Sequence, residues 1–171
     1  MTAINAQTIQ LAPEVVGALQ AQHRGPLLLP GAADYDTART VWNAMIDRRP
    51  ALVARCQDAA DVVAGVNFAR EHGLPLSIKG GGHNIAGTAV GEGLMLDLSP
   101  LRDVRVDPMS RTAAAQPGCL LSDVDRATQE HGLAAVLGFI SGTGIAGLTL
   151  GGGFGYLTRR FGWTCDNVLS M

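Results

Sequence analysis

The residues best suited to chemistry lie in a glycine cluster, Lys79-Gly-Gly-Gly-His83-Asn84, directly after a predicted strand over residues 74–78. Glycines have no Cβ, so successive backbone N–H groups can converge on an anion and wrap closely around a pyrophosphate. His83, near the end of the cluster, would then lie against the bound group. The alternative interpretation is a flexible turn after the strand that carries an exposed histidine.

A second glycine cluster contains Gly142-Thr-Gly144-Ile-Ala-Gly147, a literal G-x-G-x-x-G, with Asp166 about 20 residues beyond it. This spacing is that of a Rossmann fingerprint, which must open a helix of several turns. Gly151-Gly-Gly153 interrupts the segment after a few residues, so the sequence disfavours a Rossmann site. Ser141, Thr143 and the nearby backbone amides still offer donors suited to a phosphate or the edge of a flavin.

The size and composition of the chain limit what these clusters can bind. The 171 residues are enough for one domain with a real core. Apolar residues make up 47% and charged residues 16%, and the net charge is −2, which argues against disorder and against a nucleic-acid partner. Two separate anion-binding loops in one small chain favour a single extended ligand with a diphosphate in its middle, such as a dinucleotide.

The cysteines and the N-terminus indicate a reducing compartment. Cys56, Cys119 and Cys165 are too far apart for a CxxC metal or redox pair, and their odd number argues against a disulfide framework. We therefore predict no metal site. Residues 1–7 have neither the basic region nor the apolar run of a secretory signal, so we predict a cytoplasmic location.

One segment has the length of a membrane span. Residues 134–158 contain no charge, and Arg159-Arg160 follow like the positive flank of a transmembrane helix. The segment also holds eight glycines, each of which costs a helix roughly 0.8 to 1 kcal/mol relative to alanine. We therefore predict that it does not cross a membrane.

The elements that must position the first cluster form a strand-helix-strand unit. Residues 51–55 are predicted to form a buried strand, and Asp58 is a suitable N-cap for the helix that follows. The helix carries apolar residues at helical spacing and stops at Gly73, before the strand over residues 74–78. A right-handed crossover should make the two strands a parallel pair.

The rest of the chain contains further short elements around this unit. Helices are predicted around residues 13–22 and 36–47, in an N-terminal extension without a motif. A later helix is predicted to be capped by Ser122 and to end at Gly132. Further strands are predicted over residues 94–98, 104–107 and 112–116.

Five segments together resemble the FAD-binding domain of the FAD-linked oxidases. They are Ser77–Asn84, Leu96–Ser99, Gln116–Gly118, Gly144–Gly155 and Gly162–Asn167, in matching order and spacing. The branch is that of berberine bridge enzyme, gluco-oligosaccharide oxidase and 6-hydroxy-D-nicotine oxidase, within the vanillyl-alcohol oxidase superfamily. The resemblance covers about residues 48–171, and five joined segments are far more specific than one glycine motif.

The resemblance implies an α+β fold, a PCMH-type FAD-binding domain in two lobes with the flavin between them. The first lobe would span about residues 48–110, and the second would begin near residue 111 and be incomplete. Residues 1–47 would form a helical N-terminal extension. The substrate domain and the catalytic base would lie beyond Met171, so the resemblance assigns no catalytic residue here.

The resemblance also implies which residues hold FAD. His83 matches the histidine that is bonded to the 8-alpha methyl carbon of the flavin. Some relatives add a second bond from a cysteine whose position here is Ile140, so a single bond through His83 is expected, and Cys119 is interpreted as a buried structural thiol. The residues expected to hold the diphosphate are Lys79, Gly80, Gly81, Gly82 and Asn84. Those expected to line the flavin and its phosphates are Ser141, Gly142, Thr143, Gly144, Gly147, Gly151, Gly152, Gly153 and Phe154.

The function implied is that of an FAD-dependent oxidase. It would remove two electrons from an alcohol, sugar or amine carbon of a small molecule and pass them to dioxygen or another acceptor. The alternative is a non-catalytic flavin-binding or structural fragment without a substrate domain. A nucleophilic Cys165 activated by His131 or His83 would need geometric support that the sequence does not supply. The sequence indicates no oligomeric state.

Overall fold

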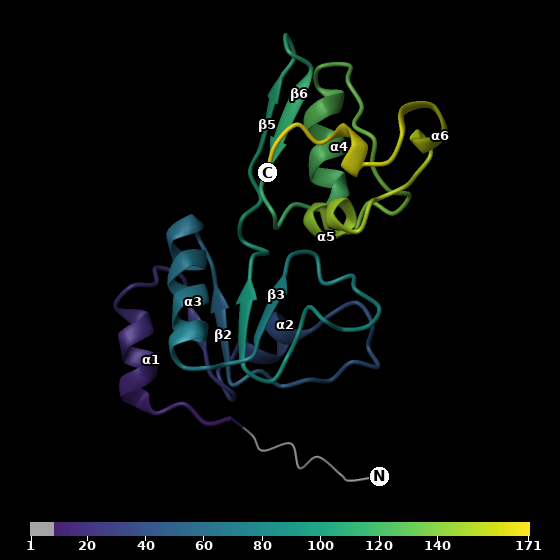
Figure 1. Cartoon of the computed structure of the whole chain (residues 1–171). Helices are drawn as coiled ribbons and strands as arrows, with labels where there is room; N and C mark the ends of the chain where they lie inside the picture. Colours follow the sequence, from purple (N-terminus) through teal and green to yellow (C-terminus); the bar gives the residue numbers. More distant parts are fainter. Residues whose placement is uncertain (1–8) are drawn as a thin grey trace.

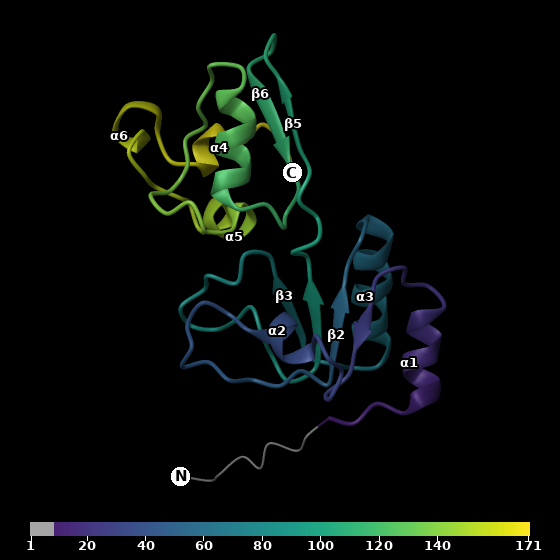
Figure 2. The same cartoon turned by 180° about the vertical axis from the view of Figure 1, so that it is seen from behind.

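A computed structural model describes residues 9–171 and shows an α+β chain in two stacked parts (Figures 1 and 2). The first part is built on a four-stranded sheet and the second on a two-stranded hairpin. The strands of the larger sheet are β1 (Leu27–Leu28), β2 (Leu52–Arg55), β3 (Leu76–Lys79) and β4 (Leu94–Asp97). Their order is β1-β2-β4-β3, with β1 antiparallel to β2 and the other neighbours parallel.

The predicted strand-helix-strand unit is present, but its two strands are not neighbours. Helix α3 (Ala59–Glu71) connects β2 to β3, and the Asp58 side chain accepts a hydrogen bond from the Asp61 amide, as an N-cap does. Strand β4 lies between β2 and β3 and is buried at every residue, whereas β3 alternates between exposed and buried residues. The continuous apolar run Leu94–Leu96 suits a central strand with both faces covered, so β4 displaces the predicted pairing.

Helices cover both faces of the larger sheet. Leu94 and Leu96 of β4 belong to the core beneath α3, where Phe68 is buried. Met95, between them, points to the opposite face and packs in the core that contains Tyr35. The helix α1 (Pro13–Gln20) contributes to the first core, and α2 (Tyr35–Arg39) to the second. The alternation of side chains along a strand thus gives three layers.

The N-terminal extension is only partly helical. Residues 1–8 of the expected extension over 1–47 lie outside the described residues. Both predicted helices exist, but the second ends at Arg39 because Thr40 adopts an extended conformation. Leu27 and Leu28 also pair with β2, which the sequence pattern did not predict. The extension is therefore built into the sheet.

The second part packs helices against the hairpin of β5 (Val104–Asp107) and β6 (Thr112–Ala115). Its helices are α4 (Leu121–Gln129), α5 (Ile145–Leu150), α6 (Thr158–Phe161) and a 3₁₀ turn at Cys165–Asn167. Leu121, Val124 and Leu137 form its buried core. The predicted N-cap Ser122 lies inside α4, because the Asp123 carboxylate accepts a hydrogen bond from the Leu120 amide (2.7 Å) and fixes the helix start earlier.

The boundary between the parts differs from the one predicted near residue 110. Residues 104–107 fall within the lobe expected over residues 48–110, but as β5 they pair with β6 in a separate sheet. The Asp107 carboxylate accepts hydrogen bonds from the amides of Met109 and Ser110, which closes a tight turn between the two strands. A short turn joins sequential strands as a hairpin, so β5 is drawn to β6. The change from one sheet to the other falls at residues 98–103.

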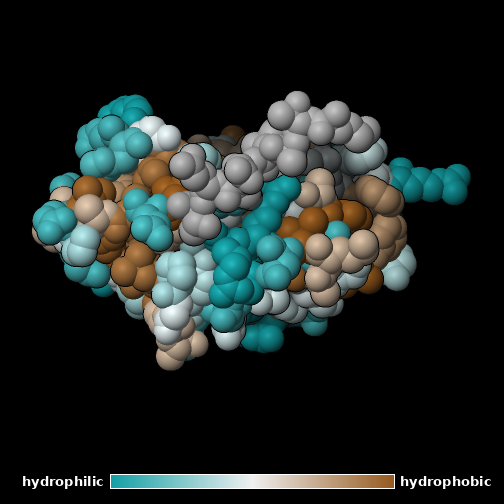
Figure 3. All heavy atoms as spheres, turned by 90° about the horizontal axis from the view of Figure 1, so that it is seen from below, coloured by the Kyte–Doolittle hydropathy of each residue, from teal (hydrophilic) through white to brown (hydrophobic). Residues whose placement is uncertain are grey.

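The uncharged segment 134–158 forms only one short helix, α5 of six residues. Within residues 9–171, no helix combines the length and the apolar character needed to cross a bilayer. Viewed from below, apolar residues gather in separate patches with hydrophilic residues between them (Figure 3).

Candidate cofactor site

The two glycine clusters meet where the two parts of the chain touch. A Cβ built on Gly81 would lie 2.5 Å from the Cα and N of Gly144, and one on Gly80 would lie 2.8 Å from the Pro117 carbonyl oxygen. Real Cβ atoms essentially never come closer than 3.0 Å to other heavy atoms. Gly80, Gly81 and Gly144 are therefore required by the contact between the parts, a role that the sequence pattern did not reveal.

A pocket of about 320 Å³ opens beside this contact. Its lining residues are Ile78, Gly80, Gly81, Gly82, His83, Asn84, Thr88, Ala89, Thr143, Gly144, Gly147 and Leu148. Within the described chain, none of the backbone amides of residues 80–84 donates to a backbone acceptor. Consecutive N–H groups without a protein partner form a concave anion site of the kind that the sequence predicts. His83 is half-buried at this site.

A second pocket of about 340 Å³ adjoins the first and shares Thr143, Gly147 and Leu148 with it. Its other lining residues are Gly138, Phe139, Ile140, Gly151, Gly153 and Phe154. The rings of Phe139 and Phe154 meet edge to face, with centroids 5.4 Å apart. A Cβ on Gly147 would meet no protein atom within 4 Å, so it would project into open space. Together the two pockets offer amide donors at one end and aromatic walls at the other.

The pockets bring together most of the residues predicted to bind the cofactor. The exceptions are Lys79, Ser141, Gly142 and Gly152. The backbone of Ser141 accepts a hydrogen bond from the Ser122 amide, and Gly152, at φ 102°, packs against the Trp163 ring. These positions support the loop around α5, and neither pocket reaches them.

The aliphatic carbons of Lys79 lie beside Gly82 of the glycine loop, but its ammonium is engaged by other parts of the protein. The side chain is buried, and its Nζ donates to the Ala38 carbonyl and lies 3.8 Å from Asp97 Oδ1. Burial lowers the pKa of its ammonium group. Arg55 Nε lies 3.2 Å from the other oxygen of Asp97. The expectation that Lys79 holds the diphosphate is therefore not met by its side chain, because the neighbouring strand carries the carboxylate that attracts it.

Trp42 is a site residue that the sequence analysis missed. Its indole stacks on the imidazole of His83, with ring centroids 4.7 Å apart and planes at 20°. Its backbone amide donates to the Gly82 carbonyl at 2.9 Å. The sequence offered one signal for this role: Trp42 is a large aromatic residue next to the polar Asn43, in a segment that lacks the apolar spacing of a buried helix or strand.

The chemistry of the site fits FAD. Unpartnered amides on glycines suit a diphosphate, and the apolar second pocket, with room left open at Gly147, suits a flat ring system. Residues 50–171 match a family model described as an FAD binding domain. The chain belongs to the FAD binding domain family. FAD is the cofactor of this family.

Individual relatives of this chain support the same assignment. It is 35% identical to (R)-6-hydroxynicotine oxidase of Paenarthrobacter nicotinovorans, over 85% of this chain and 32% of the relative. A variant of BBE-like 1 from Physcomitrella patens superposes with a TM-score of 0.85 at 27% identity, over 91% of this chain and 34% of that one. A chitooligosaccharide oxidase gives a TM-score of 0.81 at 29% identity, over 89% and 33%. The chain spans about a third of the length of the curated relatives it matches.

The cysteines of this chain do not form a nucleophilic site. Cys119 is fully buried, its Sγ donates to the Asp103 carbonyl, and burial raises the pKa of its thiol, which agrees with a structural role. Cys165 is exposed, and its side-chain contact is with Asp166. Within residues 9–171, no hydrogen bond joins Cys165 to a histidine.

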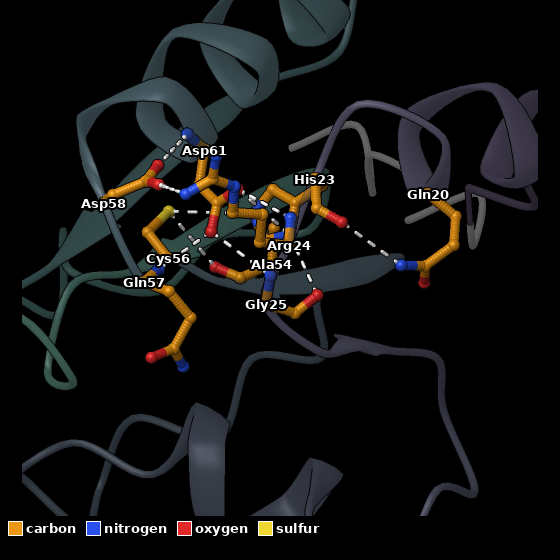
Figure 4. A network of polar contacts seen from close by, with 9 residues as sticks. All are labelled: Gln20, His23, Arg24, Gly25, Ala54, Cys56, Gln57, Asp58 and Asp61. Carbon is orange, nitrogen blue, oxygen red and sulfur yellow. Dashed lines mark hydrogen bonds and ion pairs between the residues drawn. The ribbon is translucent and has the colours of Figure 1, made fainter.

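A buried cluster of Cys56, His23 and Asp61 has the composition of a catalytic triad (Figure 4). Cys56 Sγ lies 3.9 Å from His23 Nε2, and His23 Nδ1 lies 4.0 Å from Asp61 Oδ1. Burial, together with the nearby carboxylates, raises the pKa of Cys56 to about 12. A fully buried thiol with this pKa stays protonated at neutral pH, so the cluster is structural.

The function of Asp61 is to anchor the N-terminal segment to α3. Its carboxylate accepts hydrogen bonds from the amides of Arg24 (2.7 Å), Gly25 (3.2 Å) and Gln57 (2.8 Å), as Figure 4 shows. Burial opposes ionisation, but these amides outweigh it and lower the pKa of Asp61 below 3.8. The carboxylate thus joins two distant segments, residues 24–25 and the start of the helix.

We expect Asp61→Asn to destabilise the protein by about 2–4 kcal/mol, because the amide group brings an N–H₂ toward donors that need an acceptor. The stabilisation by the Asp61 carboxylate is fully present above the ordinary pKa of 3.8 that the group has in the unfolded chain, and it is lost as the pH falls through the lower pKa of the folded state. Urea unfolding between pH 3 and pH 7 measures both effects. Asp34→Asn, at an exposed carboxylate, is the control; equal stability of the two variants would contradict the anchoring role.

Gly147 allows the pocket to be filled without disturbing the protein. Because a side chain there meets open space, Gly147→Leu is expected to leave the fold intact and to weaken FAD binding at least about tenfold by occupying the shared wall. Flavin fluorescence during titration of the flavin-free protein measures the affinity. Gly17→Leu is the matched control, because Gly17 is a helical glycine with equally open surroundings away from the pockets. Unchanged FAD affinity in Gly147→Leu would exclude the shared wall from the site.

Proposed function

We propose that this chain is the FAD-binding part of an oxidase that holds the cofactor through a covalent bond to His83. The reaction proposed is a two-electron oxidation of an alcohol, sugar or amine carbon in a small molecule, with dioxygen as the electron acceptor. The observation that carries the proposal is the position of His83 beside the unpartnered amides of residues 80–84, in one pocket. When bound, FAD would be the group that takes the two electrons from the substrate, before dioxygen receives them.

The residues of the chain would bind and orient the cofactor. The amides of residues 80–84 would hold the diphosphate, while Thr143, Gly147 and the phenylalanine pair would line the rings. Behind the glycine loop, Lys79 and Arg55 flank the single carboxylate of Asp97, so these three side chains leave a net positive charge near the diphosphate. That charge favours an anion at the end of the parallel strands.

The proposed substrate class and acceptor follow the relatives. Their names include an oxidase of 6-hydroxynicotine and an oxidase of chitooligosaccharides. Both names describe the oxidation of small molecules. A single covalent bond is proposed because Ile140 occupies the position of the second tether and lines the adjoining pocket. A cytoplasmic location is also proposed, supported by three cysteines that are free in the structure.

The visible spectrum of the purified protein, before and after acid precipitation, tests the cofactor part of the proposal. It should be recorded for residues 1–171 and for the protein at its natural length. Yellow colour that stays with the pellet is the expected result, and colour released to the supernatant would contradict the tether. Colourless protein at both lengths would contradict flavin binding altogether.

A substrate panel tests the reaction. Alcohols, sugars and amines are offered to the yellow protein of natural length, and hydrogen peroxide is measured. Peroxide release with one class would support the oxidase. Flavin that is never reduced by any class would favour the alternative of a flavin-binding or structural fragment.

A further inference from the structure

We propose that Trp42 is a positioning residue that holds the His83 imidazole in the orientation needed for covalent attachment of the cofactor. This inference rests on the proposed tether through His83. It assigns a role in cofactor attachment to the N-terminal segment, in which the sequence shows no motif. The two rings are stacked, and their planes differ by only 20°.

The stacking is unusual because Trp42 is not a core residue. Its side chain is 62% exposed, although burying an indole is normally favourable. The contact that it keeps is with His83, whose ring is half-buried beside the pocket. A histidine on a glycine loop would otherwise sample several side-chain rotamers. An indole lying on one face restricts the imidazole plane and leaves its edge free to meet a ligand.

The backbone around Trp42 is itself fixed to both ends of the glycine loop. The Trp42 amide donates to the Gly82 carbonyl, and the Asn43 side chain donates to the Ile85 carbonyl at 2.8 Å. Before the loop, the buried Lys79 ammonium donates to the Ala38 carbonyl. Residues 38–43 thus brace the loop on either side of His83, so the indole is held by the same segment that supports the loop.

In the proposed attachment, His83 is the residue whose bonds change. In attachment, His83 exchanges its imidazole N–H for a bond to the 8-alpha methyl carbon of the flavin, which gives up one C–H bond. The two hydrogens leave as two protons and two electrons and end on dioxygen as hydrogen peroxide. Trp42 exchanges no atoms or electrons. Its contribution is the geometry of the reacting nitrogen, and small errors of placement slow such reactions strongly.

The rate of covalent attachment tests the role of Trp42. Flavin-free protein of natural length is mixed with FAD, and the flavin retained after acid precipitation is followed with time. We expect Trp42→Ala to attach flavin roughly 10- to 100-fold more slowly than wild type. Trp42→Phe keeps a flat ring, so its attachment rate should lie between those of the wild type and Trp42→Ala. Met45→Ala is the control, because Met45 lies in the same segment and is 90% exposed.

A second measurement needs no cofactor. In the flavin-free protein, the indole should shift the ring-proton resonances of His83 upfield in the NMR spectrum, and Trp42→Ala should remove the shift. Absence of the shift in wild type, or equal attachment rates in wild type and Trp42→Ala, would overturn this inference alone. A wild-type protein that retains no flavin after acid would overturn the proposed tether and this inference with it.

Discussion

Replacing His83 with alanine is expected to abolish acid-stable flavin completely. Alanine offers no nitrogen for the bond to the flavin methyl carbon, whereas the amides of residues 80–84 and the second pocket remain. His83→Ala should therefore still bind FAD, but acid should release all of it. Acid precipitation and in-gel flavin fluorescence distinguish flavin that stays attached to the protein from flavin that acid releases. No other single substitution proposed for this protein is expected to change its behaviour as completely.

His131→Ala is the matched control, because His131 is exposed and lies outside both pockets. It should retain flavin after acid to the same extent as the wild type. If His83→Ala also retained its flavin through denaturation, the tether would have to be assigned to a different residue. If His83→Ala failed to bind FAD at all, His83 would be needed for binding itself rather than for attachment alone.

Gly81→Ala is expected to weaken both the fold and FAD binding, because it forces the two parts of the chain apart. The added Cβ would lie 2.5 Å from backbone atoms of Gly144, and backbone cannot rotate away as a flexible side chain can. Overpacking of this kind typically costs about 1–3 kcal/mol. FAD binding should fall more than tenfold as well, because both loops line the pocket between the parts. Thermal unfolding and FAD titration measure the two effects.

Gly91→Ala is the control, since its Cβ would meet the Ser77 side chain at an ordinary 3.5 Å. It should be close to neutral in both measurements. Gly144→Ala should resemble Gly81→Ala, because the clash is mutual. The double variant should cost less than the sum of the single ones, since the loops need to separate only once. Strict additivity would show that the two glycines do not share one contact.

Several local features of this protein follow directly from its sequence. The strand predicted over residues 74–78 is found at residues 76–79. This strand, the glycine loop after it and the Asp58 cap were predictable because each depends on neighbours in sequence. The joint order of five segments was enough to identify the FAD-binding family. The structure agrees with the predicted fold class and brings most of the predicted cofactor residues to two adjoining pockets.

The wrong predictions about strand pairing and about Lys79 concern contacts between distant segments. The residues of β5 do not show whether this strand joins the first sheet or pairs with β6. The sequence of a short strand does not specify which other strand it will hydrogen-bond to. Lys79 was predicted to hold the diphosphate because it directly precedes the three glycines of the loop. Its ammonium instead contacts Asp97, 18 residues later in the sequence, and the Ala38 carbonyl, 41 residues earlier.

The amino-acid sequence by itself determined the chemistry of this protein. Glycines supply free amides, and His83 supplies an imidazole nitrogen for the proposed bond, because these are properties of the residues themselves. Only the tertiary structure decided which residues support them. Trp42 reaches His83 because residues 38–43 cross the end of β3, and Gly81 meets Gly144 because the second part stacks on the first. Contacts of that kind arise from the packing of whole layers, which no local pattern encodes.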